Sequence, residues 1–151
     1  MSAIVIIIVV LATASSGAIF KPGEWYQHLR RPSWTPPNWA FPLVWSILYV
    51  AIGVSGWLLW QAQGLSLAMV VWGAQMVLNA AWSWLFFGLR RMDLAFVDVC
   101  AMFVLIALYI ALVLPVSTIA ALLFMPYAAW VIAAATLNRA VWRLNPEAVP
   151  G

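Results

Sequence analysis

Tryptophan is the residue type that most suggests chemistry in this sequence, because eleven of the 151 residues are tryptophan. An indole ring offers a flat apolar face for stacking and one N–H that donates a hydrogen bond. Trp45, Trp82 and Trp130 lie within long apolar stretches that also contain polar residues. Indoles in such a setting either pack against neighbouring helices or face a cavity.

Helical spacing places polar residues beside these indoles. Gln75, Asn79 and Ser83 are four residues apart, so they share one face of a helix, with Trp82 and Phe86 beside them. A polar stripe facing lipid would cost free energy, so we expect it to face inward. There it either joins neighbouring helices by hydrogen bonds or forms part of a ligand pocket.

Two further sets of side chains follow helical spacing. Trp45 and Tyr49 are four residues apart and share a face. A line at i, i+3, i+7 and i+11 consists of Tyr127, Trp130, Ala134 and Asn138. An alanine between larger groups leaves room for a ligand, but alanine is equally a packing residue.

Asp98 is the one acidic residue clearly inside an apolar stretch. A buried acid in a membrane is costly and normally has a partner. Arg90, Arg91 or an indole N–H can serve, so we expect a structural pair rather than a proton relay. The apolar stretches contain no second acid or histidine that would extend a relay.

His28 and Cys100 do not indicate a metal or catalytic site. His28, the only histidine, has no second ligand at metal spacing, and we expect it to be solvated in a loop. Cys100 is the only cysteine, which excludes an internal disulfide, and we expect it to pack as a small apolar residue. One histidine and four acids leave little for acid–base catalysis. We therefore expect no metal and no cofactor.

The composition indicates a membrane protein, since 67% of residues are hydrophobic and 7% are charged. A soluble domain of this size could not bury so much apolar surface. Five apolar stretches approach the roughly 20 residues that span a bilayer. They are 3–20, 41–60, 65–87, 94–114 and 116–141. A cleaved signal peptide is the alternative for the first, but its basic n-region is missing.

The basic residues predict how the bundle lies in the membrane. All seven fall on one side of a five-span arrangement: Lys21, Arg30, Arg31, Arg90, Arg91, Arg139 and Arg143. Basic loops remain cytoplasmic. We therefore expect the N-terminus outside and the C-terminus inside. A net charge of +3, without a basic patch, argues against nucleic-acid binding.

Residues 21–39 form the one long connection, and the rest are short, so we expect a single domain over residues 1–151. This segment contains four prolines, which stiffen it, and several aromatic residues. It is either a lid over a cavity or an interfacial aromatic belt. Trp57, Trp60 and Trp142 lie near the ends of the expected spans, where an interfacial aromatic belt accounts for them.

Several strings resemble the TspO/translocator family, also called tryptophan-rich sensory proteins or peripheral benzodiazepine receptors. In the long connection and second stretch they are Trp25-Tyr26, Arg31-Pro32-Ser33-Trp34-Thr35-Pro36-Pro37, Pro42 and Trp45. Later they are Asn79-Ala80-Ala81-Trp82-Ser83, Phe86-Phe87-Gly88, Pro126-Tyr127-Ala128-Ala129-Trp130, Ala135-Thr136-Leu137-Asn138 and Val141-Trp142-Arg143. The resemblance extends from about Ser15 to Arg143, and the order and spacing of the strings make it specific.

This resemblance implies a five-helix bundle, usually dimeric, in the bacterial inner membrane. It implies a pocket beneath the first loop that binds porphyrins, sterols and synthetic aromatic ligands. The pocket positions that carry over are Ser16, Tyr26, Trp34, Pro36, Trp45, Tyr49, Asn79, Trp82, Phe86, Trp130 and Ala134. Arg30 and Arg31 near the mouth would meet the carboxylates of a porphyrin.

The resemblance leaves three functions open. The first is a sensor, regulator or carrier that binds tetrapyrroles. The second is light-dependent porphyrin degradation, in which Trp45 and Trp130 would be the catalytic residues. The third is a transporter, against which stand the odd span number and the absence of a visible inverted repeat. Arg139 replaces the tyrosine of the sterol-recognition stretch found in animal members, which argues against sterol binding there.

Overall fold

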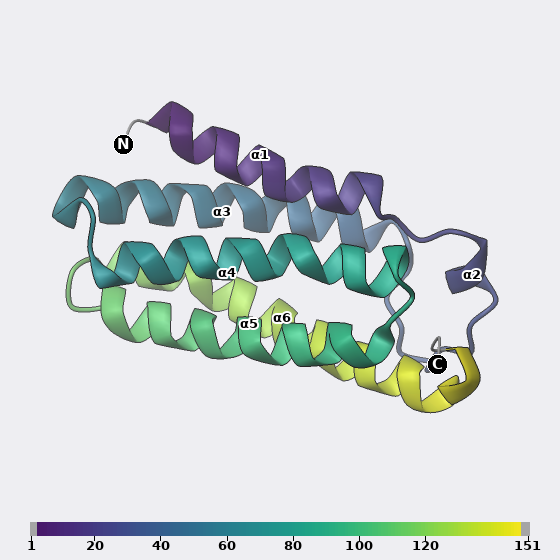
Figure 1. Cartoon of the computed structure of the whole chain (residues 1–151). Coiled ribbons are helices and arrows are strands. Elements are labelled where there is room, and N and C mark those ends of the chain that lie inside the picture. The colour runs from purple at the N-terminus through teal and green to yellow at the C-terminus, as the bar shows by residue number, and fades with distance from the viewer. Residues whose placement is uncertain (1–2, 149–151) are drawn as a thin grey trace.

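The computed structural model describes residues 3–148, and they form an all-α bundle (Figure 1). Its α-helices are α1 (Ala3–Ile19), α2 (Glu24–Gln27), α3 (Ala40–Gln63), α4 (Leu67–Ser83), α5 (Met92–Val113) and α6 (Thr118–Leu144). A π-helical turn, η1 (Trp84–Gly88), follows α4, and a 3₁₀ turn, η2 (Pro146–Ala148), follows α6. The predicted helical fold is confirmed, with boundaries that differ by a few residues from those expected.

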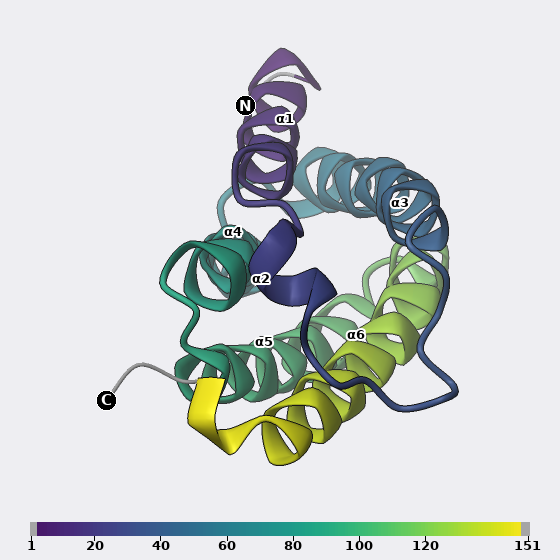
Figure 2. The ribbon, with the colours of Figure 1, turned by 90° about the vertical axis from the view of Figure 1, so that its right-hand side faces the viewer.

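Short connections make the long helices antiparallel neighbours, as expected. Helix α5 packs against α4 and α6, α3 packs against α6, and α1 lies against α3 and α4. Viewed from the end that carries α2, helices α3 to α6 are arranged in a ring, and α2 lies in front of its middle (Figure 2). The connection 21–39 therefore covers one end of the bundle, and it includes a helical turn that the sequence did not indicate.

A serine is the N-cap residue of two of the helices. Ser66 precedes α4 and accepts a hydrogen bond from the backbone N–H of Met69. Ser117 precedes α6 and accepts one from Ala120. Each satisfies an N–H that the first turn of a helix leaves free. Gly64 ends α3 with φ of 65°, a conformation that glycine adopts without strain.

The third apolar stretch is not one uniform helix. Its last turn, η1, widens so that the N–H of Leu89 donates to the carbonyl of Trp84, five residues earlier. Such a turn contains one residue more than an α-helical turn. Pro126 lies inside α6, and the helix continues through it from Thr118 to Leu144. A proline there removes one backbone hydrogen bond.

Four helical segments in the described part of the chain are long and apolar enough to cross a bilayer: Ala40–Gln63, Leu67–Gly88, Met92–Val113 and Thr118–Leu144. The first helix, Ala3–Ile19, is apolar but has 17 residues. Many large apolar side chains on the outer faces are exposed, among them Ile7, Val77 and Val104. This exposure suits a bundle surrounded by lipid.

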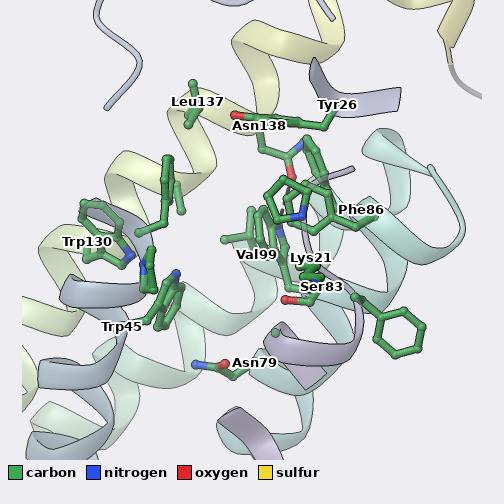
Figure 3. Close-up of a pocket in the computed structure, with 18 of the residues that line it drawn as sticks. Lys21, Tyr26, Trp45, Asn79, Ser83, Phe86, Val99, Trp130, Leu137 and Asn138 are labelled. Carbon is green, nitrogen blue, oxygen red and sulfur yellow. Dashed lines mark hydrogen bonds between the residues drawn. The ribbon is translucent and has the colours of Figure 1, made fainter. Parts of the chain in front are cut away.

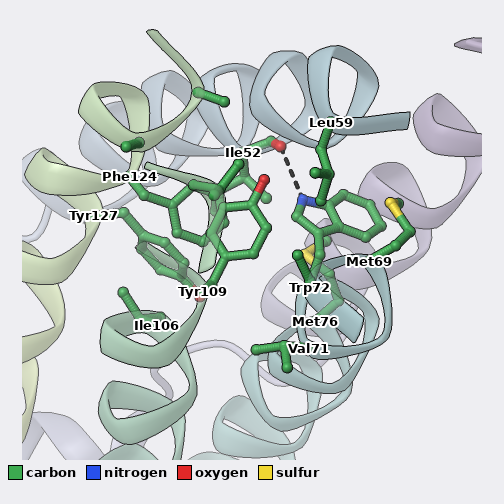
Figure 4. Close-up of a cluster of buried hydrophobic side chains, with 14 of the residues drawn as sticks. Ile52, Leu59, Met69, Val71, Trp72, Met76, Ile106, Tyr109, Phe124 and Tyr127 are labelled. Carbon is green, nitrogen blue, oxygen red and sulfur yellow. Dashed lines mark hydrogen bonds between the residues drawn. The ribbon is translucent and has the colours of Figure 1, made fainter. Parts of the chain in front are cut away.

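The half of the bundle farthest from α2 is tightly packed (Figure 4). Trp72 is 2% exposed, and its N–H donates to the backbone oxygen of Ile52 at 3.1 Å. Gly56 lies against the Trp72 ring so closely that an added Cβ would be 2.6 Å from a ring carbon. Tyr109 packs on Phe124 with ring centroids 4.2 Å apart. Aromatic side chains here serve as core.

Cys100 and Asp98, on α5, differ from expectation. Cys100 is exposed on the outside of the bundle and does not pack in the core, because it lies on the face of α5 away from α4 and α6. Asp98 is buried, but Arg91 does not reach it. The guanidinium of Arg91 binds Asp93 through two hydrogen bonds of 2.9 and 2.7 Å. Among the described residues Asp98 has no ion pair or hydrogen bond with Arg90, Arg91 or an indole N–H, so the expected structural pair is wrong.

Candidate functional site

A cavity of about 610 Å³ occupies the half of the bundle nearest α2 (Figure 3). Side chains from α1, the connection 21–39, α3, α4, η1, α5 and α6 all contribute to its wall. Its volume falls in the range of pockets that enclose small organic ligands. The helices thus leave open space where the opposite half is filled.

One wall of the cavity is a cluster of aromatic rings from α3 and α6. Trp45 stacks on Tyr49 with ring centroids 5.5 Å apart. The edge of Trp130 meets Trp45 at 6.4 Å and Phe41 at 5.8 Å. Edge-to-face and offset contacts of this kind are the favoured arrangements of aromatic pairs. They define the faces that a flat ligand would meet.

A chain of hydrogen bonds begins at Tyr49 and Asn79 in the cavity wall and continues into the bundle. The hydroxyl of Tyr49 donates to the side-chain oxygen of Asn79 at 2.8 Å, and the Asn79 amide donates to the hydroxyl of Tyr127 at 2.7 Å. The Tyr127 hydroxyl donates to the side-chain oxygen of Gln75 at 2.8 Å. Gln75 and Asn79 therefore join α4 to α3 and α6. Asn79 also lines the cavity, so both interpretations of the polar stripe apply to this residue.

A second aromatic surface faces the cavity from α4 and η1. Trp82 stacks on Phe86 with ring centroids 5.2 Å apart. The Trp82 N–H donates to the side-chain oxygen of Asn138 at 3.1 Å, and the Asn138 amide donates to the backbone oxygen of Met92 at 2.9 Å. Asn138 thus holds the Trp82 ring in place. Within η1, the consecutive residues Phe86 and Phe87 both line the cavity.

The connection 21–39 is fastened over the cavity at two points. Tyr26 of α2 is 5% exposed and packs against the edges of Phe86 and Phe87. At Arg30, the backbone N–H donates to the side-chain oxygen of Asn145, and the Asn145 amide donates back to the Arg30 carbonyl. These contacts tie the connection to the end of α6, as a lid requires.

An ion pair at the surface accompanies this attachment. The Arg30 guanidinium donates to the Glu147 carboxylate at 2.8 Å, with both side chains largely exposed. The pKa of Glu147 lies below its ordinary value, first because a backbone N–H donates to the carboxylate and then because Arg30 does. Exposed pairs of this kind add little to stability.

The basic residues near the cavity are not arranged as the sequence suggested. Arg30 is paired with Glu147, and the Arg31 guanidinium lies over the Tyr26 ring at 5.0 Å. Lys21 lines the cavity, and it is the one charged residue among the described residues that do so. Lys21 comes two residues after the end of α1, and its place in the sequence does not show that its side chain lines the cavity.

The structure brings most of the expected pocket residues together. Those that line the cavity are Tyr26, Trp45, Tyr49, Asn79, Trp82, Phe86, Trp130 and Ala134. Ser16, Trp34 and Pro36 are not among the lining residues. The Ser16 hydroxyl donates to the backbone oxygen of Ala80 and so joins α1 to α4, and Trp34 is 51% exposed.

Sequence reasoning missed several lining residues, including Lys21, Phe41, Phe87 and Leu137. Phe41 begins an apolar stretch, and helical spacing from Trp45 (four residues on) would have identified it. Leu137 and Phe87 carry no signal that distinguishes them from packing residues.

Two polar atoms of the described structure are buried without a hydrogen-bond partner: the N–H of Trp130 and one carboxylate oxygen of Asp98. Buried polar atoms are nearly always paired, so each is unusual. Trp130 lines the cavity, whereas Asp98 is not among the lining residues. The N–H of Trp130 is therefore the group whose missing partner a ligand can supply.

Comparison with known proteins identifies this arrangement. Residues 3–143 match the model of the TspO/MBR family, which covers nearly the whole chain. The chain belongs to the TspO/MBR family. With its four long apolar helices, this TspO/MBR chain is an integral membrane protein.

Relatives of this TspO/MBR chain occur in bacteria and animals. The chain is 37% identical over 143 residues to "Protein CrtK" of Rhodobacter capsulatus, covering 90% of the chain and 88% of that protein. It is 39% identical over 140 residues to the "Tryptophan-rich sensory protein" of Cereibacter sphaeroides, covering 91% and 89%. It is 40% identical over 137 residues to the human "Translocator protein", covering 85% and 81%. The bacterial relatives agree with the inner membrane as its location.

Proposed function

We propose that this TspO/MBR protein binds a porphyrin or similar tetrapyrrole in the cavity beneath the connection 21–39 and acts as a sensor, regulator or carrier. The observation that carries the proposal is a cavity with opposed aromatic surfaces, Trp45 with Trp130 on one side and Trp82 with Phe86 on the other. A tetrapyrrole is flat and largely apolar, and stacks on such surfaces.

Polar groups at defined positions would orient the ligand. Lys21 provides a cation for a carboxylate side arm near the lid, in the role that we had expected of Arg30 and Arg31. Trp130, whose buried N–H has no partner in the described structure, would provide a second donor after a small adjustment of its ring. No acidic side chain is found among the described residues of the lining, so the cavity favours an anionic ligand over a cationic one.

Fluorescence titration with protoporphyrin tests this proposal. We expect the porphyrin to quench tryptophan emission and the Trp45→Ala, Trp130→Ala double variant to bind at least about tenfold more weakly, since two ring contacts are lost. Trp57→Ala is the matched control, because Trp57 is exposed outside the cavity. Unchanged affinity in the double variant would contradict the pocket assignment.

Light-dependent degradation of the bound porphyrin is a second candidate, favoured by one observation. The Trp45 and Trp130 rings lie 6.4 Å apart, and both line the cavity, so both would contact a bound ring. Electron exchange between these indoles and an excited porphyrin would then need no metal. Ring opening is an oxidation, for which dissolved dioxygen would be the oxidant. Illumination in air should yield a linear product with the unaltered protein above the free-porphyrin background, and none above it with the double variant or without dioxygen.

We further propose that the single domain spans the membrane five times, with the N-terminus outside and the C-terminus inside, and that two copies form a homodimer. Helix α1 would be the fifth span, since 17 residues reach the lower limit for crossing the hydrocarbon. The seven basic residues all belong to the end that carries α2. Cysteine-accessibility labelling at each end, in a Cys100→Ala background, tests the orientation, and crosslinking in membranes tests the dimer.

A further inference from the structure

A groove on the outside of the bundle lies between α3 and α6. Its volume is about 410 Å³, and its lining is entirely apolar: Val44, Ile47, Leu48, Pro126, Ala129 and Trp130. Ile47 is 61% exposed and both helices are long enough to span the bilayer, so the groove faces the hydrocarbon. It is therefore accessible to apolar molecules dissolved among the lipid chains.

Trp130 belongs both to this groove and to the inner cavity. From inside, its ring meets Phe41 and Trp45. From outside, it lies beside Ala129 and Pro126 at the edge of the groove. The indole is thus a shared partition between the lipid side and the cavity.

The Trp130 ring is not fastened as other indoles are. The Trp72 N–H donates to the carbonyl of Ile52, and the Trp82 N–H donates to Asn138. The Trp130 N–H has no partner in the described structure, so rotation of this ring breaks no hydrogen bond. Pro126 lies one helical turn before it and removes a backbone hydrogen bond of α6. Helix and ring can therefore adjust together at this position.

Entry of a ligand past the lid would break more contacts than entry through the groove. Two hydrogen bonds join the Arg30 backbone to Asn145, and Tyr26 is buried against the cavity wall. A ligand that entered past the lid would break these contacts. Since a flat apolar ligand concentrates in the bilayer, the groove also has the greater supply of ligand.

We propose that the groove between α3 and α6 is an outer binding site for the same flat apolar ligand as the cavity, and that the ligand passes from the bilayer into the cavity when the Trp130 ring turns aside. The inference rests on the proposed function. It adds the route of entry and assigns Trp130 a second role, as a partition as well as a ring contact.

Stopped-flow absorbance of protoporphyrin mixed with protein in lipid vesicles tests the route. The Ala129→Trp variant fills the groove from α6 and Ile47→Trp fills it from α3, and neither residue lines the cavity. Val104→Trp, on the exposed face of α5, is the control for added bulk. We expect association and dissociation to slow together by about tenfold in both groove variants, with Kd unchanged, since only the path is altered.

The outcomes separate the two proposals. If the unaltered protein binds no porphyrin, the proposed function fails. If it binds, but the groove variants associate as fast as Val104→Trp, the groove is not the route. An Asn145→Ala variant, which frees the lid from α6, should leave the association rate unchanged. Faster association in that variant would assign entry to the lid end and overturn the inference.

Discussion

The two halves of this bundle use the same residue type in opposite ways. Trp72, in the half farthest from the lid, is 2% exposed, fastened by its N–H and pressed against Gly56. Trp130, in the half nearest the lid, lines a cavity and has a buried N–H without a partner. The difference shows that tryptophan content alone does not reveal a ligand site. What distinguishes the site is the space beside the ring and the unmet hydrogen bond.

The boundary between the halves is the hydrogen-bond chain through Tyr49, Asn79, Tyr127 and Gln75. It connects three helices, so the distal half forms a rigid base on which the cavity is held. Four predictions test this division, beginning with the largest expected effect.

Replacing Trp72 with alanine should remove about 3–5 kcal/mol of stability, because it opens a large cavity in the filled core and removes the indole hydrogen bond to the Ile52 carbonyl. Thermal unfolding in detergent, followed by circular dichroism, measures the loss. Trp57→Ala, at an exposed site, should unfold at a temperature close to that of the unaltered protein. Equal melting temperatures for the two variants would remove the distinction between core and periphery.

Replacing Gly56 with alanine should cost about 1–3 kcal/mol, since the new methyl group would meet the Trp72 ring at 2.6 Å and the ring has no free space to move into. Gly73→Ala is the matched control, because a Cβ there meets nothing within 4 Å. The control should be neutral or slightly stabilising, as alanine favours helix more than glycine does. A neutral Gly56→Ala would mean that the distal core is looser than the structure indicates.

Two Trp→Phe substitutions in the lid-side half compare an indole N–H that donates a hydrogen bond with one that does not. Trp82→Phe should cost about 1 kcal/mol or more, because the Asn138 oxygen loses its donor. Trp130→Phe removes an N–H that has no partner, so in the absence of ligand it should cost less than Trp82→Phe. Thermal unfolding of the two variants without ligand measures the contrast, and the reverse order would show that the Trp130 N–H is paired.

The smallest effect concerns the lid. The pKa of Glu147 is lowered in the folded protein, so its charged form stabilises the attachment above the ordinary carboxyl pKa, and this contribution is lost as the pH falls through the lowered pKa. We expect the protection of lid amides from hydrogen exchange, taken relative to the intrinsic rate at each pH, to decrease slightly in acid. Glu147→Gln should show no such acid dependence, and equal behaviour of both proteins would assign the effect to other groups.

The sequence predicted the helices well, because apolar stretches long enough to cross a bilayer have few alternatives. Helical spacing also predicted that the stripe with Asn79 faces the interior, whereas Trp45 and Trp130 were expected in a pocket because of the family resemblance. Spacing does not say which neighbour a face meets. The partner of Arg91 and the isolation of Asp98 were therefore not predicted correctly.

The lid shows a different limit of sequence reasoning. Residues 21–39 have no helical period, so neither α2 nor the attachment of Arg30 to Asn145 follows from their order. Lys21 was counted as a topological charge, and its position in the cavity wall depends on how the chain turns after α1. The positions of Trp34 and Pro36 outside the lining depend on the same path.

The π-helical turn at Trp84–Gly88 has a consequence for variation in this family. It contains one residue more than an α-helical turn, and Phe86 and Phe87 within it both line the cavity. Deleting a single residue there would restore an ordinary turn and change the direction of these two rings relative to α4. An insertion or deletion of one codon can thus reshape the ligand space while the long helices keep their packing, which makes this turn a natural place for new ligand preferences to evolve.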